Sequence, residues 1–281
     1  MSRNGNAVTQ IEEDEMVRLY QSGFSSNDIG KELGRCGRGV RRRLSNRGVI
    51  RDRAAATRLA TSRGKIRNPN RLVSPDFFRH LTPGAAWVLG LIAGDGHVQS
   101  YAKRQQHTVY MAGSKEVMSK AAVLMGYKNE PEVHSQSDKC WTLRFSGWDI
   151  IKVLRDQYGM CGKKATTLRL PNLSDDMLPH YLRGLWDADG HWRRSNAGTL
   201  TTMLASASNK MCEDVLTAVS PHLMFCSEIS IGHSVFKLNG KEFDGYRLSF
   251  RADVSEEFKW FVYKDSTERT RCARKYDIAF L

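Results

Sequence analysis

Hydrophobic positions near the N-terminus recur at the three- and four-residue spacing of short amphipathic helices. The pattern predicts one helix over 12–23, a second over 25–34, in which Ile29 and Leu33 share a face, and a third over 35–47. A glycine ends each of the first two stretches. Because the three segments follow one another closely, we expect a small all-α unit.

The rest of the chain mixes helical and strand patterns. WTLRFSG (141–147) and YRLSFRA (246–252) alternate apolar and polar residues, which predicts half-buried strands. A helical pattern follows each strand, over 148–159 and over 254–264. Serines suited to helix N-caps open two further predicted helices, 115–126 and 209–220.

One segment occurs twice. The chain reads WVLGLIAGDGHV at 87–98 and YLRGLWDADGHW at 181–192, with Gly, Leu, Asp, Gly and His in register at an offset of 94 residues. The strands and helices described above follow both copies in the same order. We therefore predict that each half runs helix, two strands, helix, two strands, helix, as one unit present twice.

The formal net charge of +13 is concentrated in one block. Residues 35–71 carry 13 basic side chains, 12 of them arginine, and one acid, whereas residues 1–34 carry 3 basic and 6 acidic side chains. Arginine favours phosphates and base edges, so nucleic acid is the predicted partner. The three N-terminal helices then resemble a helix-turn-helix with 35–47 as its recognition helix; an ordinary basic helical hairpin is the alternative.

Small residues in the repeat predict how its two helices pack. Gly90 and Gly94 lie one turn apart, as do Gly184 and Ala188. Such faces allow two helix backbones to approach closely. We expect the two helices to pack side by side and parallel, so that they end at the same place.

Parallel packing would bring Asp95 and Asp189 together at the two helix ends. Gly96 and Gly190, which follow them, are expected to adopt the left-handed conformation that closes a helix. Two carboxylates beside two helix C-termini form a negatively charged pocket. A pocket with oxygen ligands suits Mg²⁺.

The two segments resemble the paired motifs of the LAGLIDADG homing endonucleases, in the single-chain form that carries both copies. The resemblance covers roughly residues 77–281. It implies that Asp95 and Asp189 are the catalytic, metal-binding pair. It also implies that the residues before them, Gly94 and Ala188, offer backbone carbonyls to the metal.

The resemblance further implies a basic residue beside each active site. Lys164, with Lys163 as a substitute, and Lys264 stand at corresponding places after the two motifs, and a plain surface cation is the alternative for each. The first copy has Ala93 where the second has Asp187, at a position that is not a metal ligand in this family.

The fold class implied is α+β: two αββαββα halves, related by a pseudo-twofold axis, form a LAGLIDADG-type saddle behind a small all-α helix-turn-helix domain. The expected domains are 1–50 (helix-turn-helix), 51–76 (basic linker), 77–165 (first half) and 166–281 (second half). Arginines on the recognition helix, linker, hairpin tips and exposed strand faces are expected to contact DNA, the first two at base edges: Arg35, Arg38, Arg41, Arg42, Arg51, Arg53, Arg104, Arg144, Arg193, Arg194, Arg247 and Arg251.

The predicted function is that of a site-specific homing endonuclease that makes a Mg²⁺-dependent double-strand break in a long asymmetric DNA target. Mn²⁺ is expected to substitute, and Ca²⁺ to support binding without cleavage. The alternatives are a maturase of its own intron RNA on the same fold and a non-catalytic DNA-binding regulator. With both half-sites in one chain, a monomer is expected. No apolar run approaches the roughly 20 residues that span a bilayer, so a cytoplasmic protein without a membrane partner is expected.

Overall fold

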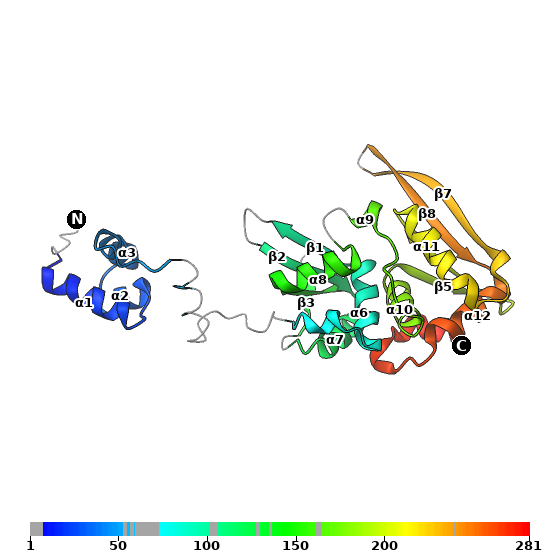
Figure 1. Cartoon of the computed structure of the whole chain (residues 1–281), viewed down its shortest axis with the longest axis horizontal. Coiled ribbons are helices and arrows are strands. Elements are labelled where there is room, and N and C mark those ends of the chain that lie inside the picture. Colours follow the sequence, from blue (N-terminus) through cyan, green and yellow to red (C-terminus); the bar gives the residue numbers. More distant parts are fainter. Residues whose placement is uncertain are drawn as a thin grey trace. The chain divides into compact units, whose positions relative to one another are not determined.

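The computed structural model describes residues 8–52, 55–56, 59, 73–101, 106–127, 130–134, 137–160, 164–238 and 240–281. The chain forms two compact units, Met1–Pro69 and Asn70–Leu281, each with its own core (Figure 1). Val73, which lies in the segment expected to be a linker, is buried in the core of the second unit. The end of that segment is therefore part of the second folded unit.

Three helices form the first unit: α1 (Gln10–Gln21), α2 (Ser26–Glu32) and α3 (Gly37–Asn46). Thr9 and Ser25 cap α1 and α2, and each hydroxyl accepts a hydrogen bond from the backbone N–H three residues later. The apolar positions of the three helices meet in one small core, which comprises Met16, Tyr20, Ile29, Val40 and Leu44.

Helix α3 begins two residues later than the sequence predicted, where α2 and α3 approach closely. A Cβ on Gly30 would lie 2.9 Å from the Gly37 backbone nitrogen, and a Cβ on Gly37 would lie 3.0 Å from the Asn27 Cα atom. A side chain at either glycine would push the helices apart, so both positions need glycine for space.

In the second unit the element order αββαββα occurs twice. The first copy consists of α6 (Pro83–Ala93), β1 (His97–Tyr101), β2 (Gln106–Gly113), α7 (Lys115–Leu124), β3 (Glu132–His134), β4 (Ser137–Ser146) and α8 (Trp148–Tyr158). The second consists of α10 (Leu178–Asp189), β5 (Gly190–Arg194), β6 (Leu200–Ser206), α11 (Asn209–Val219), β7 (Ile229–Leu238), β8 (Lys241–Phe250) and α12 (Ala252–Tyr263). The other elements among the described residues of this unit are α5 (Asp76–Arg79), α9 (Lys164–Thr167), α13 (Ala273–Phe280), η3 (Ser220–His222), η4 (Cys226–Glu228) and η5 (Glu268–Thr270).

Each copy forms a four-stranded antiparallel sheet, with the strand orders β1-β2-β4-β3 and β5-β6-β8-β7. Met111 pairs with Leu143 in the first sheet and Leu204 with Leu248 in the second, and all four side chains are buried. The mixed α+β class is therefore confirmed, and both copies carry the expected element order.

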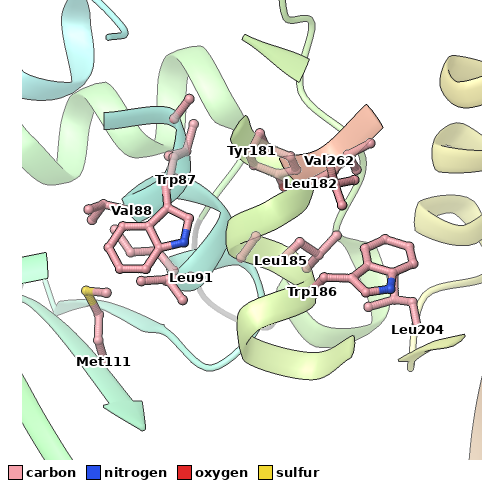
Figure 2. Close-up of a cluster of buried hydrophobic side chains, with 14 of the residues drawn as sticks. Trp87, Val88, Leu91, Met111, Tyr181, Leu182, Leu185, Trp186, Leu204 and Val262 are labelled. Carbon is pink, nitrogen blue, oxygen red and sulfur yellow. The ribbon is translucent and has the colours of Figure 1, made fainter. Parts of the chain in front are cut away.

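Helices α6 and α10 lie side by side between the two sheets (Figure 1). Every residue of α6 from Ala85 to Ala93 is buried. Figure 2 shows Trp87 on the side of Met111 and Trp186 on the side of Leu204, and all four belong to one core that runs through both copies. Although α6 is apolar on all sides, no helix among the described residues is long and apolar enough to cross a membrane.

The prediction that the glycines after the motif helices adopt the left-handed conformation is wrong. Gly190 has φ −76° and ψ 153° and is the first residue of β5, and Gly96 does not have a positive φ either. Both glycines are needed for space instead. A Cβ on Gly96 would lie 2.6 Å from the Ile92 Cα atom, and a Cβ on Gly190 would lie 2.5 Å from the Trp186 ring.

Candidate active site

The two motif helices contact each other through their small residues. A Cβ on Gly90 would lie 2.9 Å from the Gly184 Cα atom and 2.7 Å from the Leu185 backbone nitrogen, and a Cβ on Gly184 would collide with the Trp87 carbonyl. One turn later, a Cβ on Gly94 would lie 2.5 Å from the Ala188 Cβ atom. The contacts advance in the same direction along both helices, so the helices are parallel, as predicted.

Parallel packing brings the two motif acids to neighbouring helix ends. Asp189 is the last residue of α10, and Asp95 follows α6 by two residues. Both are exposed at these ends. The Asp189 Oδ2 atom lies 3.1 Å from the place that a Cβ on Gly94 would occupy, so the carboxylate of one copy rests against the backbone before the acid of the other.

A cavity adjoins each acid, and the two cavities have corresponding walls. The cavity at Asp95 has a volume of about 370 Å³, and the cavity at Asp189 about 120 Å³. Leu91 and Val117 line the first, and Leu185 and Met211, at the same 94-residue offset, line the second. The sequence repeat therefore corresponds to two related cavities, of which the Asp95 cavity is larger.

Each cavity also takes part of its wall from the segment that follows the other copy. Ala165 of α9, which follows the first copy, lines the cavity at Asp189. Arg274 and Lys275 of α13, which follow the second copy, line the cavity at Asp95. Lys164 begins α9 and so lies in the segment beside Asp189, not beside Asp95 as its sequence distance indicated. Lys163 is outside the described residues.

The position of Lys264 does not support its predicted role. It follows the last residue of α12, is exposed, and lies near enough to His180 to help lower the pKa of that histidine. His180 is in the first turn of α10, nine residues before Asp189, or roughly 13 Å along the helix at 1.5 Å per residue. Counting residues from each motif missed this because the segments after the two copies differ in length.

Lys275 is a basic residue at the end of α10 that the sequence analysis missed. Its Nζ atom donates to the carbonyls of Trp186 (2.7 Å), Ala188 (3.0 Å) and Gly190 (2.7 Å), at the end of α10. Burial lowers the pKa of Lys275. Because the Ala188 carbonyl already accepts a bond from an ammonium group, its predicted role as a metal ligand is disfavoured. The run RTRCARK at 269–275 was the available sequence signal.

Asp187 joins both motif helices to the C-terminal segment. Its Oδ2 atom accepts hydrogen bonds from Trp87 Nε1 (2.8 Å) and from the Cys272 backbone N–H (2.9 Å). Burial raises its pKa to about 6 despite these two bonds and the nearby charges of Lys275 and Arg183. Asp187 is therefore a buried structural acid.

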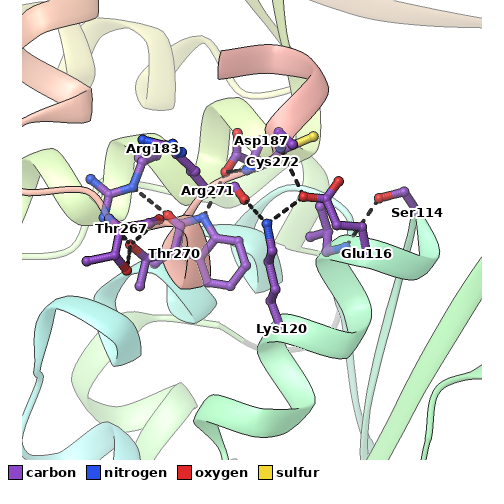
Figure 3. A network of polar contacts seen from close by, with 12 residues as sticks. Ser114, Glu116, Lys120, Arg183, Asp187, Thr267, Thr270, Arg271 and Cys272 are labelled. Atoms are coloured by element: carbon purple, nitrogen blue, oxygen red, sulfur yellow. Dashed lines mark hydrogen bonds and ion pairs between the residues drawn. The ribbon is translucent and has the colours of Figure 1, made fainter. Parts of the chain in front are cut away.

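Further polar contacts hold the C-terminal segment against the first copy (Figure 3). Lys120 of α7 donates to the Arg271 carbonyl at 3.0 Å, and Glu116 accepts from the Ala273 backbone N–H at 3.1 Å. The same segment carries Arg274 and Lys275, which line the Asp95 cavity, so this cavity is built from both copies.

The strand arginines differ in what they contact. Arg193 on β5 and Arg247 on β8 are both exposed. Arg144 on β4 is half-buried over the Tyr110 ring, 4.9 Å from its centroid. Arg251 is exposed but follows β8 as the N-cap of α12. Arg104 is outside the described residues.

Arg194 was expected to contact DNA, but its guanidinium is engaged within the protein. Its Nη1 atom donates to the Gly198 carbonyl at 2.8 Å and its Nη2 atom to the Ala279 carbonyl at 2.7 Å. It therefore ties the β5–β6 turn to α13, a role that strand alternation could not reveal.

In the first unit, acidic side chains of α1 bind three arginines of the basic block. Arg35 lies 3.0 Å from Glu12, Arg43 3.1 Å from Glu13, and Arg47 2.6 Å from Asp14. Arg35 also lies before α3 rather than on it. Its pairing with Glu12 disfavours the predicted base contact.

Three other arginines remain exposed on α3. Arg38, Arg41 and Arg42 line a hollow of about 620 Å³ together with Ser45 and Asn46. Their spacing places them on one face of the helix. Of the two arginines in the following segment, Arg51 rests on the Tyr20 ring, 3.9 Å from its centroid, and Arg53 is outside the described residues.

Neither a family model nor a curated protein matches the chain in sequence. Solved structures similar to it are homing endonucleases. Variants of the homing endonuclease I-DmoI share 14% identity over 69% of this chain and 97% of theirs, with a TM-score of 0.45. I-WcaI bound to its DNA recognition sequence shares 10% over 73% and 91%, with a TM-score of 0.46. The LAGLIDADG meganuclease I-AabMI bound to uncleaved DNA shares 13% over 70% and 87%, with a TM-score of 0.41. TM-scores below 0.5 leave the function to be inferred from this chain's own residues.

Proposed function

We propose that the protein is a site-specific DNA endonuclease that makes a metal-dependent double-strand break in a long asymmetric target. The observation that supports this most directly is the pair of exposed acids, Asp95 and Asp189, at the neighbouring ends of two parallel helices packed through glycine. Each acid adjoins its own cavity. Two equivalent acids with two cavities suit a reaction that is carried out once on each strand.

The donor set fits a hard divalent cation. Asp95 and Asp189 offer carboxylate oxygens, and Gly94 offers a backbone carbonyl. Among the described residues no group of three or more His, Cys, Asp or Glu side chains could hold a metal ion. Mg²⁺ is commonly held by one or two carboxylates, with water and substrate phosphate completing its shell. We therefore propose Mg²⁺, with Mn²⁺ as a substitute and Ca²⁺ for binding alone.

The protein's own side chains would act electrostatically, the acids by holding cations and the basic residues by offsetting negative charge on the phosphate. Asp95 and Asp189 would each hold a cation, and a bound cation would lower the pKa of water and offset charge on the leaving oxygen. Arg274, exposed at the Asp95 cavity, would offset charge on the attacked phosphate. Lys164 remains the proposed cation for the cavity at Asp189.

The first unit would add affinity for DNA. In the helix-turn-helix interpretation, Arg38, Arg41 and Arg42 on the exposed face of α3 would enter the major groove. The exposed Arg193 and Arg247 of the second sheet would contact the same DNA.

Cleavage of a plasmid library tests the proposal. The protein should linearise a subset of plasmids with Mg²⁺ and none with Ca²⁺, and sequencing of the ends should yield one asymmetric site. Asp95→Asn and Asp189→Asn should each abolish double-strand cleavage and leave specific binding nearly unchanged, because ligand charge is lost while the DNA interface remains. Full double-strand cleavage by both variants would contradict the site assignment.

A further inference from the structure

Lys275 makes a contact that links the two copies. It comes from α13, after the second copy, and it lines the cavity at Asp95. Its buried ammonium group nevertheless bonds to carbonyls on both sides of Asp189: those of Trp186 and Ala188 before the acid and that of Gly190 after it. The last carbonyls of a helix lack partners within the helix, and a cation at this end is stabilising.

These bonds distinguish the two motif acids. In the second copy the buried Asp187 lies close enough to Lys275 to raise the pKa of that lysine against the effect of burial. The first copy has Ala93 at the corresponding position. The end of α10 is thus held by a buried lysine and accompanied by a buried carboxylate, a combination that the sequence of α6 does not repeat.

We propose that Lys275 is a positioning residue for Asp189: by holding the three carbonyls around it, Lys275 fixes the direction of the Asp189 carboxylate and thereby supports cleavage of one strand more than of the other. This inference rests on the proposed nuclease function. Lys275 also lies near Asp95 and lines its cavity, but its three hydrogen bonds go to carbonyls around Asp189. We therefore expect the DNA strand served by Asp95 to be the less affected one when Lys275 is replaced.

Mn²⁺ titration followed by electron paramagnetic resonance tests the effect on the metal site. Lys275→Met should weaken Mn²⁺ binding by about 10- to 100-fold, the usual effect of removing a partner that orients a metal ligand. Lys275→Arg, which keeps charged donors, should restore part of this loss. Lys120→Met is the matched control, because Lys120 bonds to the Arg271 carbonyl of the same C-terminal segment and to Glu116, and not to the carbonyls around Asp189 that Lys275 holds. It should bind Mn²⁺ as the wild type does.

Strand-resolved nicking of the library-selected target provides the second measurement. Lys275→Met should accumulate DNA nicked in the same strand that Asp189→Asn still cuts. A folded Lys275→Met protein with wild-type Mn²⁺ affinity and balanced nicking would overturn the proposal, as would equal losses in Lys120→Met. If Lys275→Met shows no cooperative thermal transition, Lys275→Gln takes its place with the same expected and contradicting results.

Hydrogen exchange separates this inference from the proposed function. Amides of residues 186–191 should exchange faster in Lys275→Met than in Lys120→Met, with or without metal. Equal exchange in the two variants would overturn the positioning role. A wild-type protein that neither binds Mn²⁺ nor cuts DNA would overturn the nuclease function, while the exchange result would still decide whether Lys275 holds the end of α10.

Discussion

Arg183 and His180 show how a buried polar pair fixes its own protonation. Arg183 is fully buried, and it donates to the carbonyls of Val262 and Thr270, both at 2.7 Å. Its Nη2 atom lies 2.7 Å from His180 Nδ1. Because a guanidinium only donates, Nδ1 must accept, and the neutral ring carries its proton on Nε2. Burial, and then the charge of Arg183, lowers the pKa of His180 to about 4.

Unfolding as a function of pH should reveal this histidine. In the unfolded chain His180 takes up a proton near its ordinary pKa of 6.5, whereas the folded protein resists protonation down to about pH 4. The contribution of His180 to the free energy of unfolding should therefore fall as the pH is lowered from 6.5 towards 4, whereas the raised pKa of Asp187 acts in the opposite direction over this range. His180→Asn, which keeps an acceptor for Arg183, should show a smaller fall in urea titrations. Identical pH profiles for the two proteins would contradict the assignment.

Arg274 and Lys264 form a pair of variants that tests which basic residue serves Asp95 and Asp189. Arg274→Ala should slow cleavage by about 10²–10³, the usual loss when one electrostatic stabiliser is removed. Lys264→Ala, at the far end of α10, should cut at the wild-type rate. Single-turnover cleavage and DNA affinity should be measured together. A slow Lys264→Ala protein beside a normal Arg274→Ala protein would restore the role first predicted for Lys264.

At the scale of elements, the contact between α6 and α10 decides where both acids lie. Gly184→Ala should lower the free energy of unfolding by at least the roughly 1–3 kcal/mol typical of overpacking, because the added methyl group meets the rigid Trp87 carbonyl. Gly232→Ala on β7 is the control, since its Cβ would come no closer than 4.0 Å to the Arg247 carbonyl. Urea denaturation compares the two. A Gly184→Ala protein as stable as the control would show that the helices can separate without cost.

The arginines on α3 and just before it differ in whether they are exposed or paired within the protein. Arg41→Ala, on the exposed face, should reduce the slope of log affinity against log salt by about 0.9, the value for one lost phosphate contact. Arg35→Ala, which breaks the pair with Glu12, should leave the slope unchanged. Filter binding over a salt series distinguishes them. The opposite order of effects would show that Arg35 leaves Glu12 to contact DNA.

At the scale of the whole molecule, we expect the first unit to contribute affinity for DNA and the second unit to carry out cleavage. A protein consisting of residues 70–281 keeps Val73 and the whole second core. It should still cleave, because both acids lie in this part, but it should bind less tightly, with a shallower salt dependence and a shorter footprint. Footprinting and salt titration of both proteins provide the test. An unchanged footprint would mean that the first unit serves something other than target DNA.

The sequence by itself determined the parts of this protein that depend on local pattern. Apolar spacing located the helices and strands, and the doubled motif with its small residues was sufficient to predict parallel helices ending at Asp95 and Asp189. These features follow from periodicity and from the absence of side chains at contact positions. Both are properties of short stretches of chain.

Only the tertiary structure decided which distant segment completes each cavity. Lys264 was placed by counting residues, but a chain segment can return to either copy, and α13 returns to bring Arg274 and Lys275 to Asp95. In the same way Arg35 and Arg194 looked like DNA contacts until their partners, Glu12 and the Ala279 carbonyl, were seen. A charged side chain is equally suited to phosphate and to an internal acceptor, and the choice depends on which groups the folded chain places within hydrogen-bonding distance.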